Sequence, residues 1–298
     1  MAVHTLDLHF QGTPGIIAAY LVECGQRELA LIETGPGSTL EALRQAITAR
    51  GFSPASVRHV FVTHIHLDHA GAAGWFGQQG AQIFCHPNAQ RHLVDPAKLI
   101  DSARLVYGAA MDTLWGAMLP APAEKVTALQ DGESVTIAGT QITAWDTPGH
   151  ARHHHAYSIE DACFTGDVAG LRLENTPYIS VTAAPPQFDP IAYTASVDRL
   201  LGAGFRKLHL THFGEITDVS SHLTAYRDRI SEVHLTIRDW VTAGHSPEEI
   251  RRLYHDAERR RATQAGVSGS LWQRYQLGNA TAMCADGIRL HVEKAATA

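Results

Sequence analysis

The sequence predicts an α/β fold in which several strands end in polar residues at one edge of a sheet. Short apolar runs rich in β-branched and aromatic residues, such as 57–62, are typical of buried strands. Four such runs are followed closely by His or Asp side chains, which begin at His64, His150, Asp167 and His212. The edge formed by strand ends is the usual place for a site on an α/β sheet.

Alternating polarity, helical spacing and end signals assign the individual elements. The expected strands are 4–10, 15–22, 28–32, 57–62, 82–85, two strands within 126–146, and 206–210. The expected helices are 39–50, 190–201, 222–243, 246–265 and 269–283. Ser38 suits the N-cap of the first helix, and Gly51 suits its end. Ser246, Pro247 and Glu249 predict a capped N-terminus for the helix over 246–265.

The densest group of polar side chains follows the strand at 57–62. Four residues that could bind a metal ion lie within six positions: His64, His66, Asp68 and His69. Alternation in an extended segment places the first three on one side and turns His69 toward a second position. The small residues at 70–74 allow a tight turn into a helix. This arrangement suits two metal ions better than one.

Three more candidate ligands follow later strands. They are His150 after Thr-Pro-Gly, Asp167 after Gly166, and His212 after the run 207–210. In a chain with 19 histidines, a single His at a strand end is usually an ordinary polar residue. The same combination of strand and ligand, repeated four times, is hard to obtain by chance.

The motifs HxHxDH, TPGH, Gly-Asp and a final His together resemble those of the metallo-β-lactamase superfamily, over residues 4–214. The resemblance implies a four-layer αββα sandwich with a binuclear metal site at one edge. It implies that His64, His66 and His150 hold one metal ion and that Asp68, His69 and His212 hold the other. Asp167 would bridge the two ions.

The resemblance also divides the chain into a catalytic domain at 1–218 and a helical C-terminal extension at 219–298. Within the first domain, 88–125 is an additional helical insertion rich in apolar residues. That insertion is compatible with two interpretations. It either packs as core, or it forms a wall of the substrate pocket or a homodimer contact. The extension resembles the helices that some superfamily members lay across the active site to complete the substrate pocket.

Composition sets the class of protein. The chain has 298 residues, 45% hydrophobic and 18% charged, which is ordinary for a soluble globular enzyme. With 24 basic and 30 acidic residues the net charge is −6, which disfavours a nucleic-acid partner. The sequence contains neither a secretory signal nor a membrane span, and its four cysteines form no close pair. We therefore expect a cytoplasmic protein with a small-molecule substrate.

Several residues near the expected site have open roles. Glu33 stands where the superfamily commonly has an Asp that supports the metal ligands, so it either tunes metal affinity or is a structural turn residue. His86 and His154 match histidines that lie near the site in related proteins without binding metal. Tyr178 and Arg172 follow the bridging position and are candidates for substrate contact.

Imidazole and carboxylate ligands without a thiolate suit zinc first, and iron or manganese would also be accommodated. Two such ions about 3.5–4 Å apart would share a bridging water and lower its pKa toward roughly 7. The resulting hydroxide would attack a carbonyl or phosphoryl centre. Asp68 and Asp167 would accept and relay its proton.

The preferred function is hydrolysis of a small ester, thioester or lactone, as in glyoxalase II-like thioesterases or lactonases. A mononuclear iron persulfide dioxygenase-like oxidoreductase is the main alternative, although the presence of His69 and His212 counts against it. A phosphodiesterase shares the ligand set and is disfavoured by charge. A flavodiiron protein would carry Glu at the place of His66, and a binding module without metal would not need all seven ligands.

Overall fold

The computed structural model describes residues 2–26, 28–174 and 176–296. These residues form two compact units. Unit 1 comprises Met1–Asp146 and His153–Gly166, and unit 2 comprises Thr147–Arg152 and Asp167–Ala298. The predicted boundary between residues 218 and 219 divides the chain at another place and stays a prediction.

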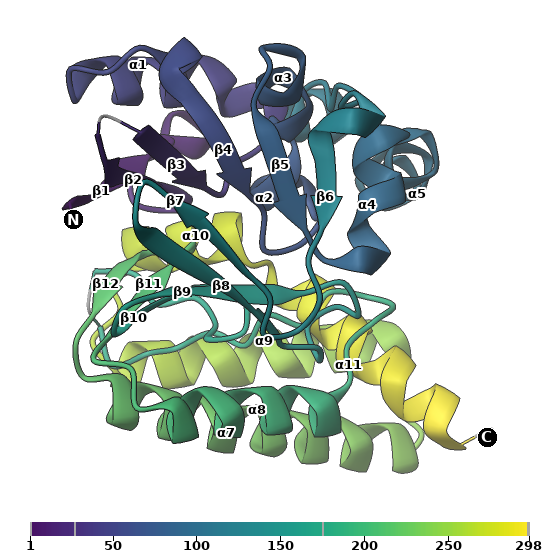
Figure 1. Ribbon diagram of the computed structural model, residues 1–298. Coiled ribbons are helices and arrows are strands. Elements are labelled where there is room, and N and C mark those ends of the chain that lie inside the picture. Colours follow the sequence, from purple (N-terminus) through teal and green to yellow (C-terminus); the bar gives the residue numbers. More distant parts are fainter. Residues whose placement is uncertain (1, 27, 175, 297–298) are drawn as a thin grey trace. The chain divides into compact units, whose positions relative to one another are not determined.

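Unit 1 contains a six-stranded sheet in the order β1-β2-β3-β4-β5-β6 (Figure 1). Its strands are β1 (Ala2–Asp7), β2 (Ala18–Gly25), β3 (Glu28–Ile32), β4 (Val57–Phe61), β5 (Gln82–Cys85) and β6 (Val126–Ala128). β1, β2 and β3 pair antiparallel, whereas β3, β4, β5 and β6 pair parallel. Parallel pairing brings the carboxyl ends of β3, β4 and β5 to one edge, as the sequence predicts.

Four further strands in unit 1 form an antiparallel series in the order β10-β9-β8-β7. They are β7 (Ser134–Ile137), β8 (Thr140–Asp146), β9 (His155–Ile159) and β10 (Ala162–Gly166). Two strands were expected within 126–146, and three are present, because β6 belongs to the first sheet and β7 and β8 form a hairpin. Ala138 and Gly139 both have positive φ in that hairpin, which matches the twist of the flanking strands.

Aromatic side chains fill the space between the two sets of strands. Phe61 stacks on Phe84 with 4.6 Å between ring centroids, and the Tyr157 ring meets Phe61 edge-on at 5.3 Å. Tyr20 and Phe164 make a similar contact at 5.3 Å. Burial raises the pKa of Tyr157 well above its usual value, and its hydroxyl donates a hydrogen bond to the Val62 carbonyl at 3.1 Å. These contacts join the two sheets of unit 1 through an aromatic core.

The helices of unit 1 are α1 (Leu40–Ala49), α2 (Leu67–Ala70), α3 (Ala73–Gln78), α4 (Pro87–Val94), α5 (Ala97–Tyr107) and α6 (Met111–Trp115). Short 3₁₀ segments lie at Phe10–Gly12, Gly37–Thr39, Pro54–Ser56, Gly108–Ala110 and Ala123–Lys125. The expected N-cap at Ser38 is wrong. The 3₁₀ turn moves the start of α1 by one residue, and the Ser38 hydroxyl instead donates to the Leu114 carbonyl at 2.6 Å.

The range 88–125, predicted to be an insertion, contains helices that differ in burial. Met111 and Met118 are buried, whereas α5 contributes no buried residue. The Leu105 side chain is 90% exposed. Core packing therefore explains part of the insertion, and α5 presents apolar side chains to the surface.

Unit 2 is mainly helical and includes a short hairpin of β11 (Lys207–Leu210) and β12 (Gly214–Ile216). Its helices are α7 (Pro190–Ala203), α8 (Val219–Thr242), α9 (Pro247–Gln264), α10 (Gly269–Gly278) and α11 (Thr281–Ala296). α8 packs along α7, and it also contacts α9 and α11 (Figure 1). The predicted capping box of Ser246 and Glu249 is present at the start of α9. The single helix expected over 269–283 is wrong, because the chain leaves helical geometry at Asn279 and starts α11 at Thr281.

Two features of the side chains bear on chemistry. All four cysteines are buried and free. Burial raises the pKa of the Cys85 and Cys284 thiols to about 12 and raises those of Cys24 and Cys163 as well. Among the described helices, none combines the length and apolarity that crossing a bilayer requires.

The first prediction concerns a glycine in α11. Alanine normally stabilises a helix relative to glycine by about 0.5–1 kcal/mol. A Cβ at Gly287, however, would lie 1.9 Å from the Ala183 carbonyl oxygen, so backbone would have to move. We expect Gly287→Ala to destabilise the protein by about 1–3 kcal/mol, measured by chemical denaturation.

Gly202 in α7 provides the matched control, since a Cβ there meets no atom within 4 Å. We expect Gly202→Ala to be neutral or stabilising in the same measurement. Equal stability of the two variants would contradict the close packing of α11 on residue 183.

Candidate functional site

The loop after β4 brings the four candidate ligands of unit 1 together. His64 and His69 are fully buried, with 4.0 Å between their ring centroids. His64 Nε2 lies 2.9 Å from His66 Nδ1, and His69 Nε2 lies 3.6 Å from Asp68 Oδ2. His66 occupies the N-cap position of α2 with an extended backbone, so Asp68 and His69 fall in the first helical turn. Four potential ligand side chains that are close in the sequence are therefore also close in space.

The Glu33 carboxylate supports this group from the end of β3. Its Oε1 accepts hydrogen bonds from His69 Nδ1 at 2.8 Å and from the Thr63 hydroxyl at 2.5 Å. Its Oε2 accepts from the Thr63 backbone N–H at 3.3 Å. Glu33 is buried and has a φ of 66°, a region that residues other than glycine seldom occupy. These contacts favour the supporting role for Glu33 over that of a simple turn residue.

The same contacts set the proton positions on two histidines. A carboxylate only accepts hydrogen bonds, so the Thr63 hydroxyl must donate to Glu33. The Thr63 oxygen can then accept a hydrogen bond from His64 Nδ1, which lies 3.0 Å away. His69 Nδ1 donates to Glu33 directly. In the neutral form of each ring the proton is then on Nδ1 and the lone pair on Nε2, the nitrogen that would bind a metal ion; in His64 this nitrogen also lies 2.9 Å from His66 Nδ1.

Two further histidines pack beside this group without a predicted role as ligands. The His154 ring lies 4.9 Å from the His64 ring, and the His153 ring lies 5.6 Å from the His66 ring. Gly166, at the end of β10, approaches the same place. A Cβ on Gly166 would lie 2.5 Å from Thr63 Oγ1 and 2.7 Å from His154 Nε2. The glycine of the Gly-Asp motif is thus required by the crowding around residue 63.

Unit 2 brings together the other three candidate ligands. The two carboxylate oxygens of Asp167 face different histidines, with Oδ2 3.3 Å from His150 Nε2 and Oδ1 3.4 Å from His212 Nε2. His150 Nδ1 donates to the Thr182 carbonyl at 3.0 Å, so the neutral form of the ring has its lone pair on Nε2, the nitrogen that faces Asp167. A carboxylate with one histidine at each oxygen has the form that a bridging ligand needs.

Buried hydroxyls hold the backbone of Asp167. Its carbonyl accepts hydrogen bonds from the Tyr193 hydroxyl at 2.6 Å and the Thr182 hydroxyl at 3.0 Å. The Tyr226 hydroxyl joins this network at 2.7 Å from that of Tyr193. Gly149 packs against α7, the helix that contains Tyr193. A Cβ at Gly149 would lie 2.2 Å from the Tyr193 Cα, and the φ of Gly149 is 132°, so a glycine is needed here. The glycine of the TPGH motif therefore lets His150 approach α7 closely.

Sequence reasoning missed Thr63, Thr182, Tyr193 and Tyr226. Only Thr63 has a weak sequence signal, because it directly precedes the first candidate ligand, His64. The two tyrosines come from helices far along the chain, and no local pattern indicates that their hydroxyls meet at residue 167.

A separate group in unit 1 consists of His86, Asp146 and His155, whose nearest donor atoms lie within 4.8 Å of one another. His86 Nδ1 accepts the Asn88 backbone N–H at 2.9 Å, which makes His86 the N-cap of α4. The ring proton is then on Nε2, 3.3 Å from Asp146 Oδ1. A metal ion at Nε2 would have to displace this proton. The contacts accordingly agree with the structural role predicted for His86.

Tyr178 and Arg172 have structural contacts within unit 2. The Tyr178 hydroxyl donates to Glu258 Oε2 at 2.8 Å, and its ring is 2% exposed. The Arg172 guanidinium donates to the Thr176 carbonyl at 2.8 Å and pairs with Asp218 at 3.1 Å. These contacts account for both side chains without a substrate.

The donor chemistry of both groups fits divalent metal ions. The candidates supply imidazole nitrogens and carboxylate oxygens, and in three histidines the neighbouring hydrogen bond engages Nδ1, so that the neutral ring offers Nε2 as the ligand atom. Such ligands suit zinc and also accept iron or manganese.

Comparisons with known proteins agree with these observations. A family model described as the metallo-beta-lactamase superfamily matches residues 12–212, a range that contains all seven candidate ligands. A metallo-beta-lactamase fold-containing protein, ST1585 from Sulfurisphaera tokodaii, is 25% identical over 67% of this chain and 74% of its own length. The lactamase-like protein adaB of Aspergillus niger is 24% identical over 88% of this chain, which spans only 64% of that protein. Thioesterase pkgB of Emericella nidulans is 28% identical over 54% of this chain and 37% of its own length.

Solved structures show the same fold. A metallo-beta-lactamase family protein of Thermus thermophilus, TTHA1429, aligns with a TM-score of 0.66 and 21% identity over 99% of this chain and 94% of that protein. The structure of ST1585 aligns with a TM-score of 0.63 and 22% identity over 76% of this chain and 85% of that protein. The predicted α/β class with two sheets and helices is confirmed.

The second prediction tests Glu33. In Glu33→Gln an amide nitrogen, which only donates, replaces one carboxylate oxygen, so either the Thr63 backbone N–H loses its acceptor or the Thr63 hydroxyl and His69 Nδ1 lose theirs. We expect metal affinity to fall roughly 10–100-fold, the range for groups that orient metal-binding histidines. Chelator competition on the zinc-loaded protein measures this change.

Glu28→Gln is the matched control, because Glu28 is an exposed residue at the start of the same strand. It should leave metal affinity unchanged. Unchanged affinity in Glu33→Gln as well would rule out the supporting role of the Glu33 carboxylate.

Proposed function

Because this chain belongs to the metallo-β-lactamase superfamily, we propose that it is a metal-dependent hydrolase that cleaves a small ester, thioester or lactone. The observation that carries the proposal is Asp167, whose two carboxylate oxygens each face the Nε2 atom of a histidine. The superfamily consists generally of hydrolytic metalloenzymes, and this chain retains nitrogen and oxygen donors at every position that the resemblance assigns.

We propose that the chain binds two divalent metal ions, with zinc as the first candidate. The assignment follows the superfamily resemblance: His64, His66 and His150 for one ion, Asp68, His69 and His212 for the other, and Asp167 for both. Bound ions of this kind acidify a water molecule and polarise the carbonyl group that it attacks.

The residues of this chain then have distinct tasks. The histidines act as neutral ligands, and the Glu33 carboxylate keeps the proton of His64 and His69 on Nδ1. Asp68 and Asp167 accept the proton of the attacking water and return it to the leaving group. Asp68 is suited to this task because its side chain is partly exposed, at 19%, whereas that of Asp167 is 6% exposed.

A thioester is the substrate class that the relatives favour. Two relatives carry the names thioesterase pkgB and atrochrysone carboxyl ACP thioesterase, and these names describe those proteins. The net charge of −6 disfavours a polyanionic substrate, and the exposed apolar side chains of α5 suit a partly apolar acyl group or a second copy of the chain.

The experiment that tests the proposal measures metal content and activity together. Protein purified without added metal is analysed for zinc, iron and manganese, and is assayed with acyl thioesters, aryl esters and lactones. About two zinc ions per chain and cleavage that a chelator abolishes are the expected results. About one iron per chain, with oxygen uptake on a thiol substrate and no hydrolysis, would replace the hydrolase by the oxygenase alternative.

The third prediction concerns Asp68. Asp68→Asn keeps the size of the side chain but removes its ability to accept a proton, so turnover should fall by at least about 10²-fold, the lower range for a general base. The circular dichroism spectrum and the thermal midpoint should stay close to those of the wild type. Wild-type turnover in this variant would exclude the proton-accepting role.

A further inference from the structure

The segment 171–182, which lies between Asp167 and α7 in the chain, contacts all three candidate ligands of unit 2. The Arg172 backbone N–H donates to the His212 carbonyl at 2.7 Å. The Thr182 carbonyl accepts from His150 Nδ1 at 3.0 Å, and the Thr182 hydroxyl donates to the Asp167 carbonyl at 3.0 Å. The positions of residues 172 and 182 therefore affect the positions of the ligands.

This segment has little regular structure of its own. Apart from residue 175, which lies outside the described residues, its backbone pairing is an isolated bridge between Leu171 and Ser180. Their backbone groups exchange hydrogen bonds of 2.9 and 3.1 Å. The buried backbone groups between and beyond these residues need other partners, because an unpaired buried amide or carbonyl is costly.

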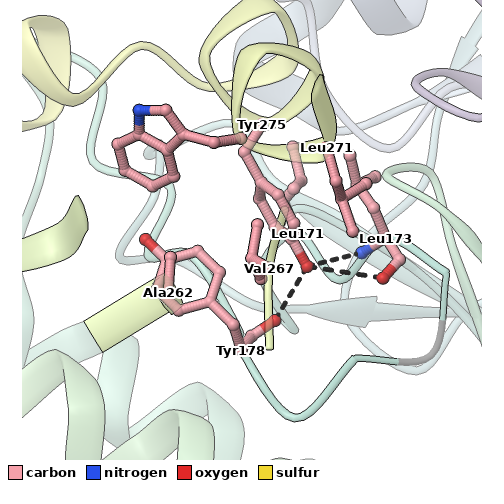
Figure 2. Close-up of a cluster of buried hydrophobic side chains, with 8 residues drawn as sticks. Leu171, Leu173, Tyr178, Ala262, Val267, Leu271 and Tyr275 are labelled. Atoms are coloured by element: carbon pink, nitrogen blue, oxygen red, sulfur yellow. Dashed lines mark hydrogen bonds between the residues drawn. The ribbon is translucent and has the colours of Figure 1, made fainter. Parts of the chain in front are cut away.

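Tyr275 of α10 supplies several of these partners through one hydroxyl. The hydroxyl accepts the Leu173 backbone N–H at 2.9 Å and donates to the Tyr178 carbonyl at 2.9 Å (Figure 2). It also lies 2.8 Å from the Thr176 hydroxyl. One side chain from the C-terminal helices thus joins both arms of the segment.

Asn279, directly after α10, supplies the next partners. Its amide nitrogen donates to the Ser180 hydroxyl at 2.9 Å and to the Val181 carbonyl at 3.0 Å. Val181 directly precedes Thr182, which contacts His150 and Asp167. The amide oxygen of Asn279 accepts from the Cys284 thiol at 3.0 Å, so both ends of the amide are fixed.

The surroundings of Tyr275 make its hydroxyl hard to replace by water. Tyr275 is 1% exposed and lies in a buried cluster with Leu171, Leu173, Tyr178, Ala262, Val267, Leu271 and Trp272 (Figure 2). Its ring contacts that of Tyr178 at 4.9 Å between centroids. Loss of the hydroxyl would leave the Leu173 N–H and the Tyr178 carbonyl without this partner in a dry environment.

We propose that Tyr275 and Asn279 are positioning residues for the metal ligands His150, Asp167 and His212, which they hold in place through the segment 171–182. This inference rests on the proposed metal site. It gives the C-terminal extension a role in metal binding that differs from covering a substrate pocket.

The test uses the full chain loaded with Zn²⁺ or Co²⁺. Tyr275→Phe removes the hydroxyl and keeps the ring, and Asn279→Ala removes the amide. Both variants should lose metal affinity roughly tenfold in chelator competition, at the lower end of the range for groups that orient metal ligands. The visible absorption spectrum of the Co²⁺ protein, which reports ligand geometry, should also change.

Leu271→Ala is the matched control, because Leu271 packs in the same cluster. It should lower the thermal midpoint at least as much as Tyr275→Phe, but leave the metal affinity and the Co²⁺ spectrum unchanged. Wild-type affinity and spectrum in both Tyr275→Phe and Asn279→Ala, or equal losses in Leu271→Ala, would overturn the inference. Failure of the wild-type protein to cleave any ester, thioester or lactone, with its metal still bound, would overturn the proposed function alone.

Discussion

The geometry of the unit 1 ligands depends on one buried carboxylate. Glu33 is almost completely shielded from water, so its negative charge must be met by donors inside the protein. The donors come from Thr63 and His69, and through the Thr63 hydroxyl the same carboxylate determines where His64 carries its proton. A single carboxylate thus orients two of the candidate ligands, His64 and His69. The Glu33 side chain reaches these donors from a left-handed backbone conformation, with a φ of 66°.

The candidate ligands of unit 2 are held in place by different groups. The His150 imidazole donates to the Thr182 backbone carbonyl, and the backbone carbonyl of Asp167 accepts from the neutral hydroxyls of Thr182 and Tyr193. The Tyr226 hydroxyl joins that of Tyr193. No buried charge other than the ligand Asp167 is needed in that network. Hydroxyl groups can donate and accept at once, so each oxygen serves several neighbours. The two units therefore orient their ligands with different chemistry, ionic in the first and neutral in the second.

The sequence predicted those parts of the fold and the candidate site that local patterns determine. Buried strands, capped helices and the spacing of His64, His66, Asp68 and His69 all have signals within a few residues. The division of the predicted helix at Asn279 has a local signal that the prediction did not use, because Gly278 and Asn279 are residues that commonly end helices. Asn279 is also held by amide contacts to residues 180 and 181. The start of α1 at Leu40 follows the 3₁₀ turn Gly37–Thr39, and the Ser38 hydroxyl, which was expected to cap the helix, instead donates to the distant Leu114 carbonyl. The supporting hydroxyls of Tyr193 and Tyr226 could not be found because they act across long separations in the chain.

The burial of the cysteines has a practical consequence for chemical labelling. All four thiols are buried, and their raised pKa values keep them protonated at neutral pH, whereas the thiolate is the nucleophile that reacts with thiol reagents. The native chain should therefore be nearly silent toward maleimides and nitroxide reagents. A cysteine substituted for Leu105, which is 90% exposed on α5, would react selectively. A fluorophore or spin label at that position would report directly on whatever molecule covers the apolar surface of this helix.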